Sequence, residues 1–129
     1  MRIFVTGATG LLGTRVVHAL LESQHEVSIV TRNATGAHEQ FKTAALEIIE
    51  ADITIQGDWQ NTAGACDAIV HLAGAGIVDR RWTTSYKQVL RSSRIESTKN
   101  VAEVANNVLV CASATGYYGD CGDQQLTEQ

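Results

Sequence analysis

The sequence predicts an α/β fold in which one parallel sheet carries helices on both of its faces. Apolar runs typical of strands alternate with segments of helical spacing along the whole chain, an order that produces parallel sheets. Several of these runs, such as residues 67–73, are apolar almost throughout, as expected for strands buried on both sides. With 129 residues, of which 44% are hydrophobic and 19% charged, the chain suits one globular domain over residues 1–129.

The first predicted strand and helix, with the turn between them, form the most informative stretch. A β-type run over residues 2–6 leads into Gly7, Gly10 and Gly13 at three-residue spacing, and helical spacing begins at Leu11. Such glycines let the backbone turn tightly and approach a pyrophosphate, which the first N–H groups of the helix can bind. We therefore interpret this loop, with Thr9 inside it, as a candidate dinucleotide-binding loop. The alternative is a tight connection with no ligand.

The elements that follow alternate in the same way. We expect a strand over 26–31, a helix over 37–45, a strand over 46–51, a helical turn near Trp59, a strand over 67–73, a long helix from Thr83 or Thr84 to about 105, and a strand over 108–112. The apolar side of the long helix comprises Tyr86, Val89, Leu90, Ile95, Val101, Ala102 and Ala105. Together these elements predict a Rossmann-type sheet with strand order 3-2-1-4-5.

Ligands of such sheets bind at the carboxyl ends of the strands, so the residues that end each strand are candidates for the site. The strand over 26–31 ends in Thr31 and Arg32, where proteins that prefer NAD place an acidic residue on the adenosine ribose. No carboxylate stands there, and the Arg32 guanidinium could pair with a 2′-phosphate. The sequence therefore predicts NADP as the cofactor, with NAD as the other possibility. The alternative for Arg32 is a solvated loop charge.

The next two strands end in residues that can line the same site. Asp52 and Ile53 follow the strand over 46–51 and are placed to cover the adenine edge. Asp52 could equally be a turn or capping residue. Leu72, Ala73 and Gly74 end the strand over 67–73, where small residues permit a close approach of the backbone to a ligand.

The last strand is followed by hydroxyl groups that would face the nicotinamide end of a dinucleotide. Ser113 and Thr115 could hydrogen-bond a substrate carbonyl, and Tyr117 or Tyr118 could donate a proton if nearby positive charge lowered the phenol pKa. The alternative is a tyrosine-rich turn that packs on the sheet. For His71, at the end of the preceding strand, we favour a structural role.

Charge and cysteine content argue against several other classes of function. The net charge is −4 and no basic run is longer than Arg80-Arg81, so nothing indicates a nucleic-acid partner or an anionic membrane surface. No apolar stretch is long enough to span a bilayer. Cys66, Cys111 and Cys121 lie at unrelated spacings, which favours reduced thiols in the cytoplasm over disulfides or zinc, and we predict no metal site.

Three motifs resemble the extended short-chain dehydrogenase/reductase family: TGATGLLG at residues 6–13, DAIVHLAG at 67–74 and SATGYYGD at 113–120. The segments RRWT at 80–83 and SRIEST at 93–98 are similar to an atypical branch, described as NAD(P)-dependent nucleoside-diphosphate-sugar epimerase-like proteins or as cell-division inhibitors. The resemblance implies pyrophosphate contacts from Leu11 and Leu12 beside the glycines. It also implies that Arg32, Asp52 and Ile53 contact adenosine and that residues 72–74 contact nicotinamide. Ser113 matches the catalytic serine of the family, with Thr115 as the alternative because the segment is one residue longer than in typical epimerases.

The sequence departs from this family at the catalytic tyrosine. No YxxxK pair follows Ser113, and Ala75-Gly76 stand where the branch usually has Glu-Pro. We also expect the substrate lobe of the family to be absent. The resemblance implies oxidoreductase or epimerase chemistry by hydride transfer, on a sugar-nucleotide-like or small carbonyl or hydroxyl substrate. One alternative is a non-catalytic regulatory module that senses the dinucleotide; another is a scaffold that self-associates, for example as a homodimer, through an uncovered last strand.

Overall fold

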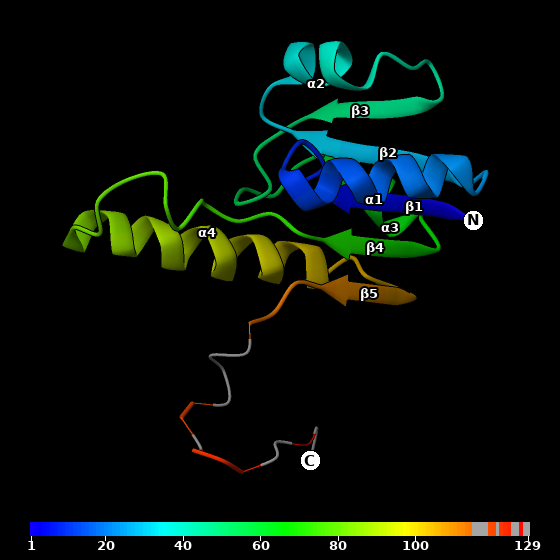
Figure 1. The fold of residues 1–129 in the computed structure, drawn as a ribbon. Coiled ribbons are helices and arrows are strands. Elements are labelled where there is room, and N and C mark those ends of the chain that lie inside the picture. The colour runs from blue at the N-terminus through cyan, green and yellow to red at the C-terminus, as the bar shows by residue number, and fades with distance from the viewer. Residues whose placement is uncertain (115–118, 121, 125–126, 128–129) are drawn as a thin grey trace.

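Five parallel strands form the central sheet, and four helices of the described residues connect them (Figure 1). The structure is a computed structural model that describes residues 1–114, 119–120, 122–124 and 127. The strands are β1 (Arg2–Thr6), β2 (Glu26–Thr31), β3 (Leu46–Glu50), β4 (Ala68–His71) and β5 (Val108–Cys111). The helices are α1 (Leu11–Glu22), α2 (Ala34–Phe41), α3 (Trp59–Gly64) and α4 (Thr84–Ala102). The order β3-β2-β1-β4-β5, with every neighbouring pair parallel, confirms the predicted fold class and topology.

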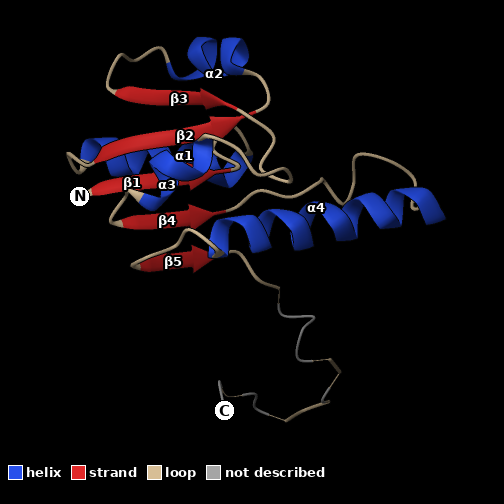
Figure 2. Ribbon diagram, turned by 180° about the vertical axis from the view of Figure 1, so that it is seen from behind, coloured by secondary structure: helices blue, strands red, loops and turns tan. Residues whose placement is uncertain are grey.

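The helices cover both faces of the sheet, as predicted (Figure 2). Because side chains alternate along a strand, β1 contributes to two separate cores. Val5 packs with Val17 of α1 and Phe41 of α2 on one face, whereas Phe4 packs on the α3 and α4 face. There the rings of Phe4 and Trp59 stack with their centroids 6.2 Å apart. Burial of each such side chain contributes about 1.5–3 kcal/mol to folding, so the two cores hold β1 and its glycine loop in place.

The buried face of α4 differs from the prediction. Val89 and Ile95, expected on the apolar side, are 48% and 44% exposed, whereas the polar residues Ser97 and Asn100 are buried. Figure 1 shows the reason: α4 begins well beyond the carboxyl ends of the strands and reaches the sheet only with its last turns. Helical periodicity predicted the helix itself, and Thr83 caps it as expected, but periodicity alone could not show how little of its length would meet the sheet.

Helix α2 begins three residues earlier than predicted because the chain supplies caps there. The Asn33 side chain accepts a hydrogen bond from the Gly36 N–H at 2.9 Å, and Glu50 of β3 accepts one from the Ala34 N–H at 2.8 Å. The helix ends at Phe41, where Lys42 takes a left-handed conformation with φ of 47°. These contacts fix the position of the segment that follows Thr31, and residues of this segment line the site described below.

Candidate functional site

The loop between β1 and α1 has a backbone that only glycine can supply at two positions. Gly7 has φ of +68°, and a Cβ there would lie 2.7 Å from backbone atoms of Leu72 and Ala73. At Gly13 a Cβ would collide with the carbonyl oxygen of Gly7. The loop therefore lies directly against the end of β4 on one side and the first turn of α1 on the other.

The start of α1 is suited to binding an anion. Gly10 is the N-cap and supplies no side-chain cap, and the first turn contains no acidic residue. The N–H groups of Leu11, Leu12 and Gly13 therefore have no acceptor at i−4 within the helix, and the positive end of the helix dipole adds to their attraction for a phosphate. The Leu11 side chain itself is 85% exposed, so any contact that it makes with a ligand comes from its backbone or its outer surface.

A cavity of about 600 Å³ opens over this loop and the neighbouring strand ends. It is lined by ten of the thirteen residues predicted to bind the cofactor: Gly7, Thr9, Gly10, Thr31, Arg32, Asp52, Ile53, Leu72, Ala73 and Gly74. The remaining three, Leu11, Leu12 and Gly13, form the first turn of α1 behind the loop. The structure thus brings the ends of β1, β2, β3 and β4 to a single cavity.

Nine further residues that were not predicted as site residues also line the cavity: Val30, Asn33, Ala51, Thr54, Ala75, Val89, Ser92, Ser93 and Ser97. Most of them adjoin predicted positions at the strand ends, so a wider window around each end would have found them. The three serines of α4 had a different signal, since they interrupt the apolar spacing of that helix. Ser93 holds the chain after β4, because its Oγ accepts a hydrogen bond from the Ala75 N–H at 3.1 Å.

Asp52 forms a turn and lines the cavity at the same time. The hydroxyl and the backbone N–H of Thr54 donate to Asp52 Oδ1 at 2.7 and 2.9 Å. These two hydrogen bonds, together with the positive charge of Arg32, hold the pKa of the Asp52 carboxyl below its usual value. Arg32 is exposed at the end of β2, so its guanidinium remains accessible to a ligand. The two interpretations of Asp52 weighed from the sequence therefore describe compatible features of one residue.

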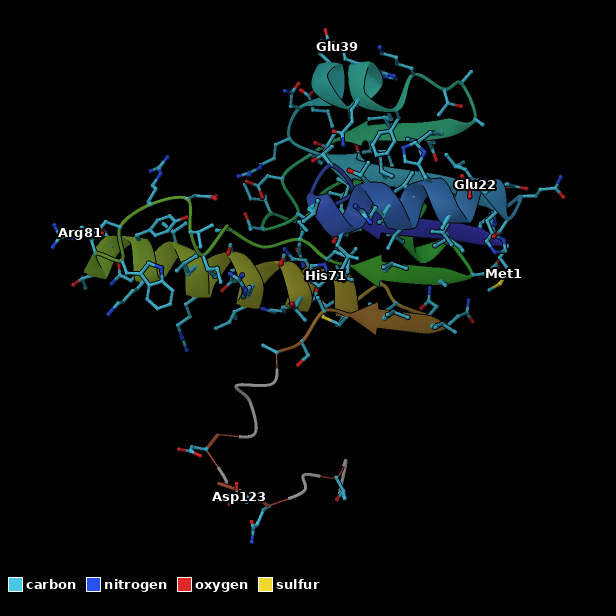
Figure 3. The ribbon with its side chains drawn as sticks, viewed as in Figure 1. Met1, Glu22, Glu39, His71, Arg81 and Asp123 are labelled. Carbon is cyan, nitrogen blue, oxygen red and sulfur yellow. The ribbon has the colours of Figure 1, made fainter. Side chains whose placement is uncertain are left out.

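His71 is buried at the carboxyl end of β4, beside the last turns of α4 (Figure 3). Its Nδ1 atom lies 2.7 Å from Thr6 Oγ1, and its Nε2 atom lies 3.1 Å from Thr98 Oγ1 and 3.3 Å from Ser97 Oγ. Burial lowers the pKa of the His71 imidazole, which favours the neutral ring. Ser97 Oγ donates to the Ser93 carbonyl at 2.6 Å and so accepts from His71 Nε2–H, which assigns the tautomer. The ring joins β1, β4 and α4, in line with the structural role that we favoured.

Ser113 lies in a second hollow, of about 310 Å³, between the ends of β4 and β5. Residues 72–74 line both hollows, so the second adjoins the first along one wall. The other catalytic candidates, Thr115, Tyr117 and Tyr118, lie outside the described residues.

The described residues show neither a metal-binding cluster nor a membrane-spanning helix. In residues 1–114 and the short described segments after them, no group of three or more His, Cys, Asp or Glu side chains is gathered as a metal site would require. Within the same part of the chain, no helix combines the length and the apolar character needed to cross a bilayer. Cys66 is buried, which raises the pKa of its thiol, and Cys111 is exposed; both are free.

The match to a family model decides which family this arrangement represents. The NAD dependent epimerase/dehydratase family matches residues 3–129. The chain belongs to this family. The NAD dependent epimerase/dehydratase family is an extended short-chain dehydrogenase/reductase family, so the resemblance carried by the three sequence motifs is confirmed.

Relatives of this epimerase/dehydratase-family chain are considerably longer. The chloroplastic SDR39U1 homolog of Arabidopsis thaliana, an epimerase family protein, is 35% identical over 127 residues, which cover 92% of this chain and 36% of the relative. The crystal structure of human SDR39U1 (isoform 2) with NADPH superposes with a TM-score of 0.57 at 29% identity, over 81% of this chain and 31% of that one. The crystal structure of a short-chain dehydrogenase/reductase superfamily protein from Agrobacterium tumefaciens with bound NAD superposes with a TM-score of 0.72 at 20% identity. The match covers 92% of this chain and 34% of that one, and it supports the fold.

Proposed function

We propose that this chain binds NADP(H) and forms the cofactor-binding part of an oxidoreductase or epimerase. The observation that carries the proposal is the single cavity to which four strand ends contribute, over a helix that starts without a side-chain cap. A cavity of about 600 Å³ lies within the range of sites that hold cofactors and other small molecules. The human relative crystallised with NADPH supports the same conclusion.

The residues at the glycine loop fit a dinucleotide. Gly7 and Gly13 permit the tight turn that packs the loop between the end of β4 and the first turn of α1, and the first N–H groups of α1 would hold a diphosphate there. Asp52 and Ile53 would cover the adenosine half. Residues 72–74, at the end of β4, would hold the nicotinamide half, close to the serines of α4.

The preference for NADP over NAD rests on the end of β2. Thr31 supplies no carboxylate to repel a 2′-phosphate, and Arg32 is exposed beside the cavity. Asn33 adds a polar side chain at the same place, although its oxygen already caps α2. Because the Agrobacterium structural relative has bound NAD, NAD remains the competing cofactor, and the experiment below compares both.

Catalysis would take place at the end of β5. Bound nicotinamide would supply hydride transfer. Ser113 in the second hollow, or Thr115 in its place, would orient the substrate oxygen, with Tyr117 or Tyr118 as candidate proton donors. The substrate is a sugar-nucleotide-like compound or another small carbonyl or hydroxyl compound. The free thiols of Cys66 and Cys111 support a reducing compartment, the cytoplasm.

Calorimetric titration of the chain with NADPH and with NADH tests the proposal. We expect both to bind, NADPH more tightly, and oxidation of NADPH with a panel of carbonyl compounds then tests turnover. Binding without turnover would favour the regulatory module that senses the dinucleotide. The proposal fails if neither nucleotide binds to a chain whose fold is intact by circular dichroism.

A further inference from the structure

The second hollow contains a cation that the proposed function does not use. Arg94 of α4 lines it together with His71, Thr98, Cys111 and Ser113, and residues 72–74 complete the wall that it shares with the larger cavity. His71 is buried within the Thr6 network, and burial favours its neutral form. Arg94 is therefore the group that carries charge among the described lining residues, and no carboxylate is among them.

The Arg94 guanidinium is held in place, but most of its hydrogen-bond donors have no acceptor among the described residues. Its Nη1 donates to the Leu90 carbonyl one turn earlier at 3.1 Å. It also lies close to Gly74, where an added Cβ would be 3.2 Å from Arg94 Cζ. Within residues 1–114 the structure shows no other hydrogen bond from this group and no carboxylate paired with it. A guanidinium has five N–H donors, so most of them stay available to a ligand in the hollow.

We propose that the second hollow binds an anionic oxygen group of the substrate, a carboxylate or a phosphate, with Arg94 as its ligand. The inference rests on the proposed function, because it treats the hollow beside residues 72–74 as the substrate side of the cofactor site. The planar guanidinium can give a carboxylate or phosphate two parallel hydrogen bonds. The hydroxyls of Thr98 and Ser113 line the same hollow and add neutral donors.

The topology separates this cation from the one expected to bind the cofactor. Arg32 follows β2, whereas Arg94 packs on the end of β4, and β1 with its glycine loop lies between those two strands. Consider a dinucleotide that places its adenosine at Arg32 and its diphosphate on the glycine loop. The 2′-phosphate on its adenosine ribose then lies on the far side of the loop from Arg94. The Arg94 charge is left for a second molecule.

The test is a nuclear magnetic resonance titration of the labelled chain, saturated with NADPH, with inorganic phosphate and with acetate. NADPH fills the glycine loop, so phosphate cannot use that site. We expect saturable shifts of the Arg94 side-chain N–H and the Gly74 amide, and the stronger of the two anions identifies phosphate or carboxylate as the natural group. Arg94→Gln should weaken this binding at least about tenfold, the size expected for loss of a charge-assisted pair.

The matched control is Arg91→Gln, one turn earlier on the same helix, because Arg91 is exposed and lines neither hollow. It should leave anion binding unchanged. Equal loss in both variants, or absence of saturable shifts with either anion, would overturn the inference while leaving NADPH binding to stand. If Arg94→Gln instead weakens NADPH binding about tenfold or more, Arg94 belongs to the cofactor site and the inference is wrong. If NADPH itself does not bind, the proposed function fails, and titration of the free chain still measures the Arg94 site.

Discussion

Thr6 Oγ1 lies 2.7 Å from His71 Nδ1, and this hydrogen bond joins β1 to β4 one residue before the glycine loop. The same hydroxyl accepts the Ala73 N–H at 3.3 Å, so Thr6 also fixes the wall that the two hollows share. Because Thr6 donates to Nδ1, and Ser97 and Thr98 accept from Nε2, the network is complete only when His71 is neutral. The position of the cavity over the glycine loop therefore depends on a titratable group.

The stability of the fold should fall on acidification because of His71. Burial places the folded-state pKa of His71 below the usual value of about 6.5, so in acid the unfolded chain binds the proton first. The contribution is fully present above about pH 6.5 and is lost as the pH falls toward the folded-state pKa. Unfolding by urea at a series of pH values measures it.

Two variants separate His71 from other acid effects. His71→Asn should cost about 2–3 kcal/mol at neutral pH, because it leaves buried hydroxyls without partners, and should flatten the pH dependence of stability near pH 6. His38→Gln on the exposed surface of α2 is the control and should keep the wild-type profile. An unchanged profile in the His71 variant would assign the acid sensitivity to other groups.

Gly7→Ala should destabilise the chain and abolish binding of NADPH. Its φ of +68° is strained for alanine, and the added Cβ would lie 2.7 Å from the backbone at Leu72 and Ala73. We expect a loss of about 1–3 kcal/mol in the free energy of unfolding. Gly57→Ala is the control, since its nearest neighbour would be Trp59 Cδ1 at 3.6 Å and its φ is unexceptional. Urea denaturation compares the two; equal stability would show that the loop can relax around a methyl group.

Replacement of Arg32 should change which cofactor is preferred. Arg32→Ala should weaken NADPH binding about tenfold and leave NADH binding nearly unchanged, because the lost charge pair involves the 2′-phosphate that NADH lacks. Thr31→Asp should go further and reverse the preference by repulsion of that phosphate. Arg15→Ala, exposed on α1 and outside the cavity, is the control. Equal weakening of both nucleotides by Arg32→Ala would mean that Arg32 stacks on adenine or acts as a general positive charge.

The strand ends of the site could be predicted from the sequence because parallel topology brings them to one edge. Once apolar runs fixed the strands and their order, Thr31, Asp52 and Gly74 had to lie beside the glycine loop, and all of them line the cavity. Each of these positions depends only on where a strand ends, and the local hydrophobic periodicity of the sequence predicts the strand ends.

The contribution of α4 could not be predicted in the same way. The path of this helix depends on the loop over residues 74–83 and on contacts such as the Tyr86 hydroxyl to the Gly76 carbonyl at 2.6 Å. Ser93 enters the site only because the last half of α4 crosses the end of β4, and Arg94 meets Gly74 for the same reason. Helical spacing states which residues share a face but not which neighbour that face meets. In this fold, tertiary packing buries polar residues of α4 and leaves part of its predicted apolar side exposed.

Self-association through β5 is the final prediction. Val108 and Val110 lie two apart on this strand and are 52% and 54% exposed, and among the described residues no strand pairs with the outer edge of β5. An apolar face beside an open edge favours pairing with another chain. Sedimentation velocity should therefore show mass that rises with concentration, and the double change Val108→Thr with Val110→Thr should reduce it. Val78→Thr, equally apolar but 88% exposed in the loop before α4, is the control. A monomer at every concentration, or an equal effect of the control, would show that β5 is not the contact surface.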